Sequence, residues 1–394
     1  MPFRLALATP DLRSLQAAWA ASATGGWAFM VALAVYAYGE GGAAAVGLAA
    51  LVRMVPAGLA APLLGRVSDR CSRRDVLLAS TLARALLLSA LSLAATLHAF
   101  PLVLVLAAVF TVAQAAHKPA QAALIPRLGP HAEAANALWT TIDNAAFILG
   151  ALAGGALVAT AGAPIAFTTA GLAFLLASFL LAKIKRDRPS LENSAANLKV
   201  PGTFKLAGLD RRAKTLVGVL SVSTLIEGMV DVLVVVTALE LVHVGEAGVG
   251  WLNGAWGVGG VVGGVLAVRL ARHGLPLGGL LIGVPLVALA VLPSPVAALF
   301  ALTALGVGYS LVETAGITRL QRLTHDQHRA RAFAALESTY WLTTGAGAML
   351  APLLIHLAGP RGALIIAGAG LPLTLLLTRL VPLKVATAVR PAAV

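Results

Sequence analysis

Long apolar stretches follow one another along the whole chain, separated by glycine and proline clusters and by charged runs. A membrane-spanning helix needs about 20 apolar residues. These runs are continuous and rich in Ala, Leu and Gly, which is typical of helices rather than of barrel strands with alternating residues. We therefore expect an all-α integral membrane protein with twelve transmembrane helices, near residues 15–38, 43–64, 76–97, 101–124, 136–160, 164–183, 215–242, 248–268, 276–292, 296–317, 333–357 and 361–381.

The composition narrows the class of protein further. Of the 394 residues, 59% are hydrophobic and 11% charged, whereas a soluble domain carries about 25% charged residues. The only cysteine, Cys71, excludes an intrachain disulfide. The sequence has no phosphate-binding glycine loop, paired-cysteine metal site or HExxH motif. We expect a transporter driven by an ion gradient or by diffusion, with no enzymatic activity, no cofactor and no metal.

Basic residues indicate the orientation in the membrane. The linker 183–214 holds nine of them. The loops expected on the opposite side of the membrane, after every odd-numbered helix, hold only Arg361. Cytoplasmic loops accumulate Lys and Arg, so we expect both termini to be cytoplasmic in a bacterial-type plasma membrane. The net charge of +13 is then a signal of topology. We expect anionic membrane lipids as partners and no binding of nucleic acid. The other basic residues of this set include Arg66, Arg70, Arg73, Arg74, Arg269, Arg272, Arg319, Arg322, Arg329 and Arg331.

Internal repetition divides the chain into two halves. Gly150 to Gly162 resembles Gly347 to Gly359 at an offset of 197 residues. Parallel repeats of this kind are typical of transporters that rock two halves against each other. We expect two pseudo-symmetric six-helix bundles at 1–183 and 215–394, joined by a cytoplasmic linker at 184–214, in a protein that acts as a monomer.

The loop after the second expected helix reads GRVSDRCSRRDVLL, from Gly65 to Leu78. It resembles the signature of the major facilitator superfamily between helices 2 and 3, although Ser72 stands where that family usually has glycine. The resemblance implies the major facilitator fold and a cytoplasmic gate. By this resemblance Gly65 is the close-packing glycine, Asp69 the gating acid, and Arg70, Arg73 and Arg74 the basic cluster. At the matching place in the second half, Arg272 stands opposite Asp69, so an acid-mediated latch is not expected there.

The fifth expected helix carries a second resemblance. The stretch beginning at Gly150 is similar to the antiporter motif of this family, with Ala151 in place of the usual proline and with Gly154 and Gly155 kept. Small residues at this spacing also serve ordinary helix packing. Over the whole chain the sequence resembles bacterial drug and siderophore exporters, which implies drug:proton antiport.

Two carboxylates lie near the middle of the seventh expected helix. Glu227 and Asp231 are four residues apart, so they share one helical face with Thr224. Charged groups inside a membrane are costly, and such residues mark transport pathways unless they are paired. The pair could bind protons or a cationic substrate. Alternatively, a basic side chain of a neighbouring helix, for example Arg53, could neutralise it.

The fourth expected helix carries a polar stripe of Gln114, His117, Lys118 and Gln121. His117 could transfer protons near neutral pH, or it could only form hydrogen bonds. Aligning the two halves sets Lys118 opposite Glu313 of the tenth helix, so a salt bridge between the halves is conceivable.

Two further groups complete the candidate residues. Asp143 could form an intramembrane charge network with Arg53 and Arg84, which would lock helices together rather than move protons. Trp27 lies on an aromatic face of the first helix and could bind a lipophilic cation through cation–π contact. Trp19 on the same face could instead be a membrane-interface anchor.

These residues predict a secondary active transporter that exports small amphiphilic or cationic compounds in exchange for protons, as in multidrug efflux. Glu227, Asp231, Glu313, His117, Gln114, Gln121 and Trp27 are the candidate coupling and binding residues. One alternative is the export or flipping of an anionic amphiphile, such as a siderophore or a lysolipid, which the net positive charge would suit. Another is a membrane receptor on the same fold that transports nothing.

Overall fold

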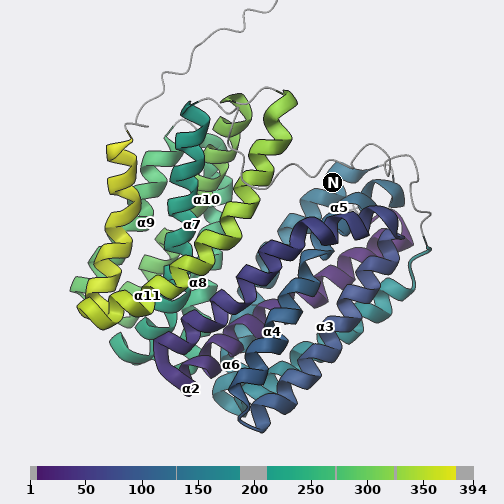
Figure 1. Cartoon of the computed structure of the whole chain (residues 1–394), viewed down its shortest axis with the longest axis horizontal. Coiled ribbons are helices and arrows are strands. Elements are labelled where there is room, and N and C mark those ends of the chain that lie inside the picture. The colour runs from purple at the N-terminus through teal and green to yellow at the C-terminus, as the bar shows by residue number, and fades with distance from the viewer. Residues whose placement is uncertain (1–6, 130, 187–210, 271–272, 324–325, 379–394) are drawn as a thin grey trace, which may run out of the picture.

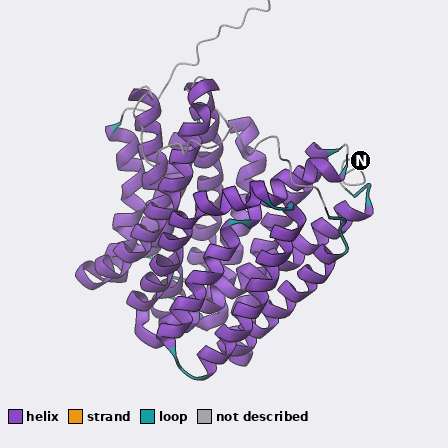
Figure 2. Cartoon of the chain, turned by 45° about the vertical axis from the view of Figure 1, so that its right-hand side comes forward, coloured by secondary structure: helices purple, strands orange, loops and turns teal. Residues whose placement is uncertain are grey.

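The computed structural model describes residues 7–129, 131–186, 211–270, 273–323 and 326–378. Most of the expected linker 184–214 lies outside these ranges. Within them the chain is helical, and it contains no strand (Figure 2). The helices are α2 (Pro10–Arg70), α3 (Arg73–Thr96), α4 (Phe100–Ala115), α5 (His117–Leu128), α6 (Ala132–Ala182), α7 (Arg211–Val236), the π-helix η2 (Thr237–Leu241), α8 (Gly245–Leu270), α9 (Gly274–Val291), α10 (Pro295–Leu323) and α11 (Asp326–Leu377).

Nine helical segments in the described ranges are long and apolar enough to cross a membrane. Two of them, Pro10–Ala60 and Ala132–Ala182, have 51 residues each. At about 1.5 Å per residue, either is far longer than the ~30 Å hydrocarbon core. Each contains non-helical backbone, at Gly41 and Gly42 in α2 and at Gly162 in α6. α11 is interrupted in the same way. Counting each interrupted helix as two confirms the twelve predicted crossings.

The interruptions of α6 and α11 fall at equivalent places in the two halves. Gly162 has φ 80° and Gly359 has φ 70°, a backbone region that residues with a Cβ seldom adopt. A proline follows each of them within two residues, at Pro164 and Pro360. The repeat that the sequence shows at an offset of 197 residues therefore ends in the same glycine turn in both halves.

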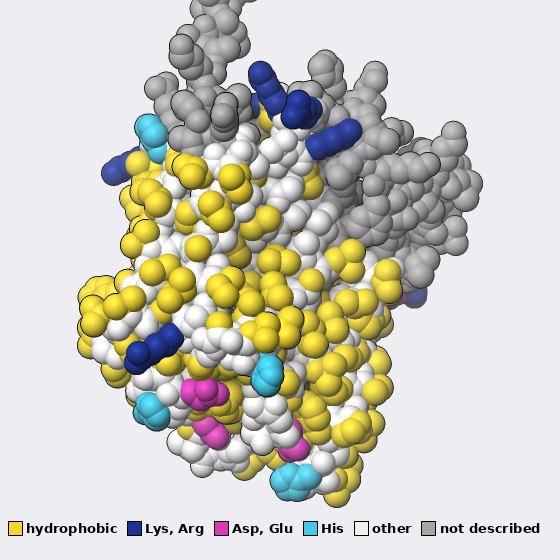
Figure 3. Space-filling model, turned by 60° about the vertical axis from the view of Figure 1, so that its left-hand side comes forward, with side chains coloured by type: hydrophobic (Ala, Val, Ile, Leu, Met, Phe, Trp, Pro, Cys, Tyr) yellow, Lys and Arg dark blue, Asp and Glu magenta, His cyan; other side chains and the backbone are white. Residues whose placement is uncertain are grey.

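The helices form two groups that lie next to each other (Figure 1). The helices α2 to α6 pack together, as do α7 to α11, and the groups touch where α6 meets α8 and where α2 meets α11 and α7. We call these groups the first and second bundles. The start of α2 and the end of α11 lie at the same end of the molecule (Figure 1). Hydrophobic side chains cover the middle of the face shown in Figure 3, with Lys and Arg mostly near its upper end and Asp and Glu near its lower end.

The bundles touch most closely toward the end opposite the start of α2. There Tyr38 of α2 donates a hydrogen bond to Glu240 of η2. Gly155 of α6 faces Gly250 of α8 so closely that a Cβ at Gly155 would lie 2.7 Å from the Gly250 Cα atom. Its neighbour Gly154 packs within the first bundle, against the backbone of Ala28. The two glycines of the antiporter-like motif therefore have different partners.

A larger side chain at Gly155 is expected to keep the bundles apart at this end. For Gly155→Val we predict that the transport rate falls by about tenfold or more, because overpacking of this kind costs about 1–3 kcal/mol. Uptake by reconstituted vesicles measures the effect. The matched control is Gly264→Val in α8, where an added Cβ meets nothing within 4 Å. Equal transport by Gly155→Val and the wild-type protein would contradict the prediction.

Candidate functional site

The candidate site is centred on one face of α7. Glu227, Asp231 and Thr224 are each partly exposed, whereas neighbouring Val230 and Val232 are buried. The i, i+3 and i+4 spacing therefore places the polar residues together, as the sequence predicts. Most of the remaining helix surface packs against α10 and α11 of the second bundle.

Close packing against α11 fixes the position of this face. A Cβ at Gly228 would collide with the backbone of α11, and a Cβ at Gly347 would collide with the backbone of α7. Small residues allow helix backbones to approach in this way. Beside this contact, the hydroxyl oxygens of Thr224 and Thr343 lie 2.6 Å apart. This packing fixes the position of the α7 carboxylates along the axis of α11.

Polar groups from α10 and α11 surround the two carboxylates. Tyr340 of α11 donates a hydrogen bond to Glu227, with 3.4 Å between its hydroxyl oxygen and Oε1. The charges of Asp231 and of Glu313 on α10 act on Glu227. Tyr309 of α10 interacts electrostatically with both carboxylates of α7. Three acids and two phenols thus share one region, and a cation or protons there would reduce the repulsion among the acids.

A buried arginine of the first bundle acts on this region. Arg53 in α2 has 6% of its surface exposed, and its Nε donates to the Thr111 hydroxyl at 3.3 Å. Its charge also acts on Asp231. Arg53 is therefore the basic residue that the sequence suggests as a partner of the pair, and it attracts Asp231 across the boundary between the bundles.

Aromatic rings lead from the first bundle to the carboxylates. Trp27 contacts Phe147 with ring centroids 4.4 Å apart, and Phe147 contacts Trp256 of α8 at 6.2 Å. Trp256 stacks on Tyr309 at 5.6 Å with an interplanar angle of 29°. Rings beside carboxylates suit an organic cation, because both attract positive charge. The sequence predicts Trp27 alone of these rings, since the others meet only through tertiary packing.

The polar stripe of the fourth crossing lies at a break between α4 and α5. Gln114 is in the last turn of α4, and His117 begins α5. His117 Nδ1 lies 2.9 Å from an Arg84 nitrogen, and the His117 ring stacks on Trp19 with centroids 5.2 Å apart. The amide of Gln121 also interacts with His117. These contacts of His117 and Gln121 lie inside the first bundle.

The members of the expected charge network have different surroundings. Arg53 acts on Asp231, Arg84 contacts His117, and Asp143 interacts with Lys118. The contacts in the described ranges thus do not join Arg53, Arg84 and Asp143 into one network. Among the described residues, no group of three or more His, Cys, Asp or Glu side chains is placed so that it could hold a metal ion.

The sequence model of the Major Facilitator Superfamily matches residues 17–235 and 216–393. The chain belongs to the major facilitator superfamily. It is accordingly a multi-pass membrane protein and a secondary transporter, and not an enzyme. No curated protein matches the chain.

Solved structures of several transporters share the fold at low sequence identity. A bacterial homologue of the human lysosomal transporter Spinster, inward-facing and occupied, has a TM-score of 0.75 at 12% identity, covering 94% of this chain and 97% of that one. The xylose transporter XylE from E. coli, inward-open, has a TM-score of 0.72 at 14% identity, covering 96% and 98%. A POT family transporter bound to a thioalcohol-conjugated peptide has a TM-score of 0.73 at 12% identity, covering 93% and 95%. At these identities the likeness establishes the fold alone.

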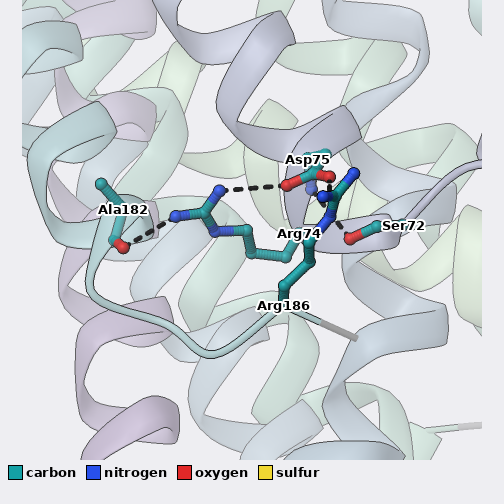
Figure 4. Close-up of polar contacts among 5 residues, drawn as sticks. All are labelled: Ser72, Arg74, Asp75, Ala182 and Arg186. Atoms are coloured by element: carbon teal, nitrogen blue, oxygen red, sulfur yellow. Dashed lines mark hydrogen bonds and ion pairs between the residues drawn. The ribbon is translucent and has the colours of Figure 1, made fainter. Parts of the chain in front are cut away.

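Part of the major facilitator signature ties α3 to the end of α6 (Figure 4). Arg74 donates to Asp75 at 3.0 Å and to the Ala182 carbonyl at 2.7 Å. Arg186, beyond the end of α6, contacts the other oxygen of Asp75 at 2.6 Å. Ser72 caps α3 by accepting from the Asp75 amide at 3.4 Å. All these contacts lie within the first bundle, and Asp75 joins them although the family resemblance assigns it no role.

The remaining signature residues lie around the same turn. Arg73 is buried at the start of α3. Gly65, Asp69 and Arg70 lie in the last part of α2, and their side chains fall outside the described part of the protein. Their role as a gate stays a prediction.

Proposed function

We propose that this transporter exports small amphiphilic cations in exchange for protons by alternating access. The carboxylate pair on α7 is the observation that carries the proposal. Glu227 and Asp231 lie with Glu313, two phenols and the ring of Trp256 on the inner side of the second bundle. Such a site attracts positive charge, and an organic cation and protons would compete for it.

Arg53 supplies a means of coupling the site to the movement of the bundles. When Asp231 is ionised, Arg53 of the first bundle attracts it and draws the bundles together at this level. When Asp231 takes up a proton, its charge disappears and so does most of this attraction. In this scheme the occupancy of Asp231 biases the equilibrium between the two arrangements of the bundles.

The orientation completes the proposal. With both termini cytoplasmic in a bacterial plasma membrane, the close contacts at Gly155 and Tyr38 lie on the outer side. The described arrangement is then inward-facing, and Asp69, Arg70, Arg73 and Arg74 form the gate that closes the cytoplasmic side.

An anionic amphiphile is the second candidate substrate class, and the cluster of Lys and Arg at one end of the molecule favours it (Figure 3). Vesicles with the reconstituted protein and an imposed pH gradient distinguish the two classes. We expect transport of a lipophilic aromatic cation such as ethidium, stopped by dissipating the gradient, and no transport of an anionic amphiphile of similar size. Gradient-driven movement of the anion alone would contradict the proposal.

The hydroxyl of Tyr340 is expected to make a small contribution to substrate affinity. Tyr340→Phe removes the hydrogen bond to Glu227 but keeps the ring. We predict an apparent affinity for the cation lowered by about fivefold, the size of one ordinary hydrogen bond. The matched control is Tyr36→Phe, because Tyr36 packs against Phe100 and Phe167 in the first bundle. Equal affinities for Tyr340→Phe and the control would argue against this contact.

A further inference from the structure

A second buried arginine, Arg84 in α3, lies in an unusual environment. Only 3% of its surface is exposed. Its Nε donates to the Ser80 carbonyl at 3.3 Å, and its guanidinium lies 4.7 Å from the centre of the Phe174 ring. Its Nη2 donates to His117. None of these partners is negatively charged, and no carboxylate of the described residues forms an ion pair with Arg84.

Such a charge is expensive to bury. An ion removed from water needs an opposite charge or a full set of hydrogen bonds. Arg53 shows how the chain meets this need elsewhere, because the negative charge of Asp231 acts on it. At Arg84 the contacting groups are neutral acceptors, the Ser80 carbonyl and His117 Nδ1, and they bring no negative charge.

The residues next to Arg84 carry buried polar atoms that are not satisfied. His117 accepts from Arg84 through Nδ1, so its other ring nitrogen carries the proton of the neutral ring. Trp19 stacks on His117, yet its Nε1–H has no hydrogen-bond partner among the described residues. Gln121 is 0% exposed and faces the same ring, yet neither of its amide atoms makes a hydrogen bond of normal geometry to this part of the chain. Thr81, one turn before Arg84 on the same face of α3, has a buried hydroxyl that makes no hydrogen bond to the described residues.

We propose that Arg84, Gln121 and Trp19 form a binding site for a small inorganic anion such as chloride inside the first bundle. The guanidinium supplies the positive charge, and the amide of Gln121 and the indole N–H of Trp19 supply neutral donors. Buried water would satisfy the polar atoms but would leave the charge of Arg84 without compensation. The site is separate from the carboxylates of α7 and does not depend on the proposed substrate.

The anion would join three crossings of the first bundle. Trp19 belongs to α2, Arg84 to α3, and Gln121 to α5, which follows the break at Ala116. Because the anion binds the folded protein and not the unfolded chain, its concentration should raise thermal stability.

The experiment compares thermal unfolding of the purified, detergent-solubilised protein in sodium chloride and in sodium gluconate, at equal ionic strength and pH and without substrate. We expect chloride to raise the unfolding temperature in proportion to the logarithm of its concentration once this exceeds the dissociation constant, by about 5 °C at roughly 100 times that constant. Absence of a difference between the two salts in the wild-type protein would overturn the proposal.

Two variants separate a specific site from a general salt effect. Gln121→Glu places a carboxylate in the cluster, and we expect this variant to have equal unfolding temperatures in both salts. The control Ser89→Ala, also in α3, should keep the wild-type difference, because the Ser89 hydroxyl donates within its own helix, to the Ala85 carbonyl. A wild-type chloride response in Gln121→Glu would contradict the site.

Trp19→Phe keeps an aromatic ring against His117 but removes the N–H donor. We expect the rise of its unfolding temperature to begin at about tenfold higher chloride concentration, the size of one hydrogen bond to a charged partner. This variant decides the matter if Gln121→Glu does not fold. A chloride dependence of the unfolding temperature equal to that of the wild-type protein would then overturn the proposal.

Discussion

Replacing both acids of α7 at once, in the variant Glu227→Gln with Asp231→Asn, is expected to reduce proton-driven transport to the level of vesicles without protein. The substitutions keep the size of the side chains but remove the groups that would exchange a proton for a cation. The phenol of Tyr340 would then donate to an amide instead of a carboxylate. Uptake of a lipophilic cation into reconstituted vesicles under a pH gradient measures the effect.

The matched control for this variant is Glu133→Gln. Glu133 is an exposed acid in the first turn of α6, so its neutralisation removes one charge without touching the site. We expect the control to transport at the wild-type rate. Proton-driven transport that persists in the double variant would show that coupling does not use the acids of α7.

The second large effect concerns Arg53 and Asp231. Asp231→Asn should destabilise the protein, because it leaves Arg53 buried without the negative charge that acts on it. Adding Arg53→Gln should restore part of the lost stability, since the buried charge is then removed as well. A double-mutant cycle on the free energy of unfolding in detergent should give a coupling energy of about 2 kcal/mol.

The informative result is whether the effects of the two substitutions on the free energy of unfolding add. If the effects of Arg53→Gln and Asp231→Asn simply add, the two residues do not interact in the folded protein, and the proposed link between the bundles fails. A comparison with Arg84→Gln provides the control, because Arg84 contacts His117 and no acid among the described residues. Its combination with Asp231→Asn should be additive.

Much of the fold follows from local patterns. Continuous apolar runs predict twelve crossings, because a membrane requires about 20 such residues in each helix. The turns at Gly162 and Gly359 follow from an internal repeat that is visible in the sequence. Glu227 and Asp231 share a face because the helical period places residues four apart on one side.

The surroundings of those acids could not be predicted in the same way. Tyr309, Tyr340 and Trp256 reach the site from three helices, and their approach depends on how each helix is rotated about its axis. Nothing in the local pattern of α10 distinguishes Tyr309 from a residue packed in the core. The sequence does suggest Arg53 as a partner of the acids, because a buried charge requires one.

The position of His117 shows a second limit. The polar stripe of the fourth crossing suggests one continuous face toward the other half, but His117 and Gln121 pack with Arg84 inside the first bundle. Periodicity predicts which residues share a face, and it does not predict toward which neighbour that face is turned.

The competition between protons and substrate at α7 can be measured directly. Purified protein in a weakly buffered detergent solution is mixed with a lipophilic cation near neutral pH, and the released protons are counted with a pH indicator. We predict release of about one proton for each cation bound, and no release from the Glu227→Gln, Asp231→Asn variant. Binding of the cation by the wild-type protein without any proton release would contradict the proposed exchange.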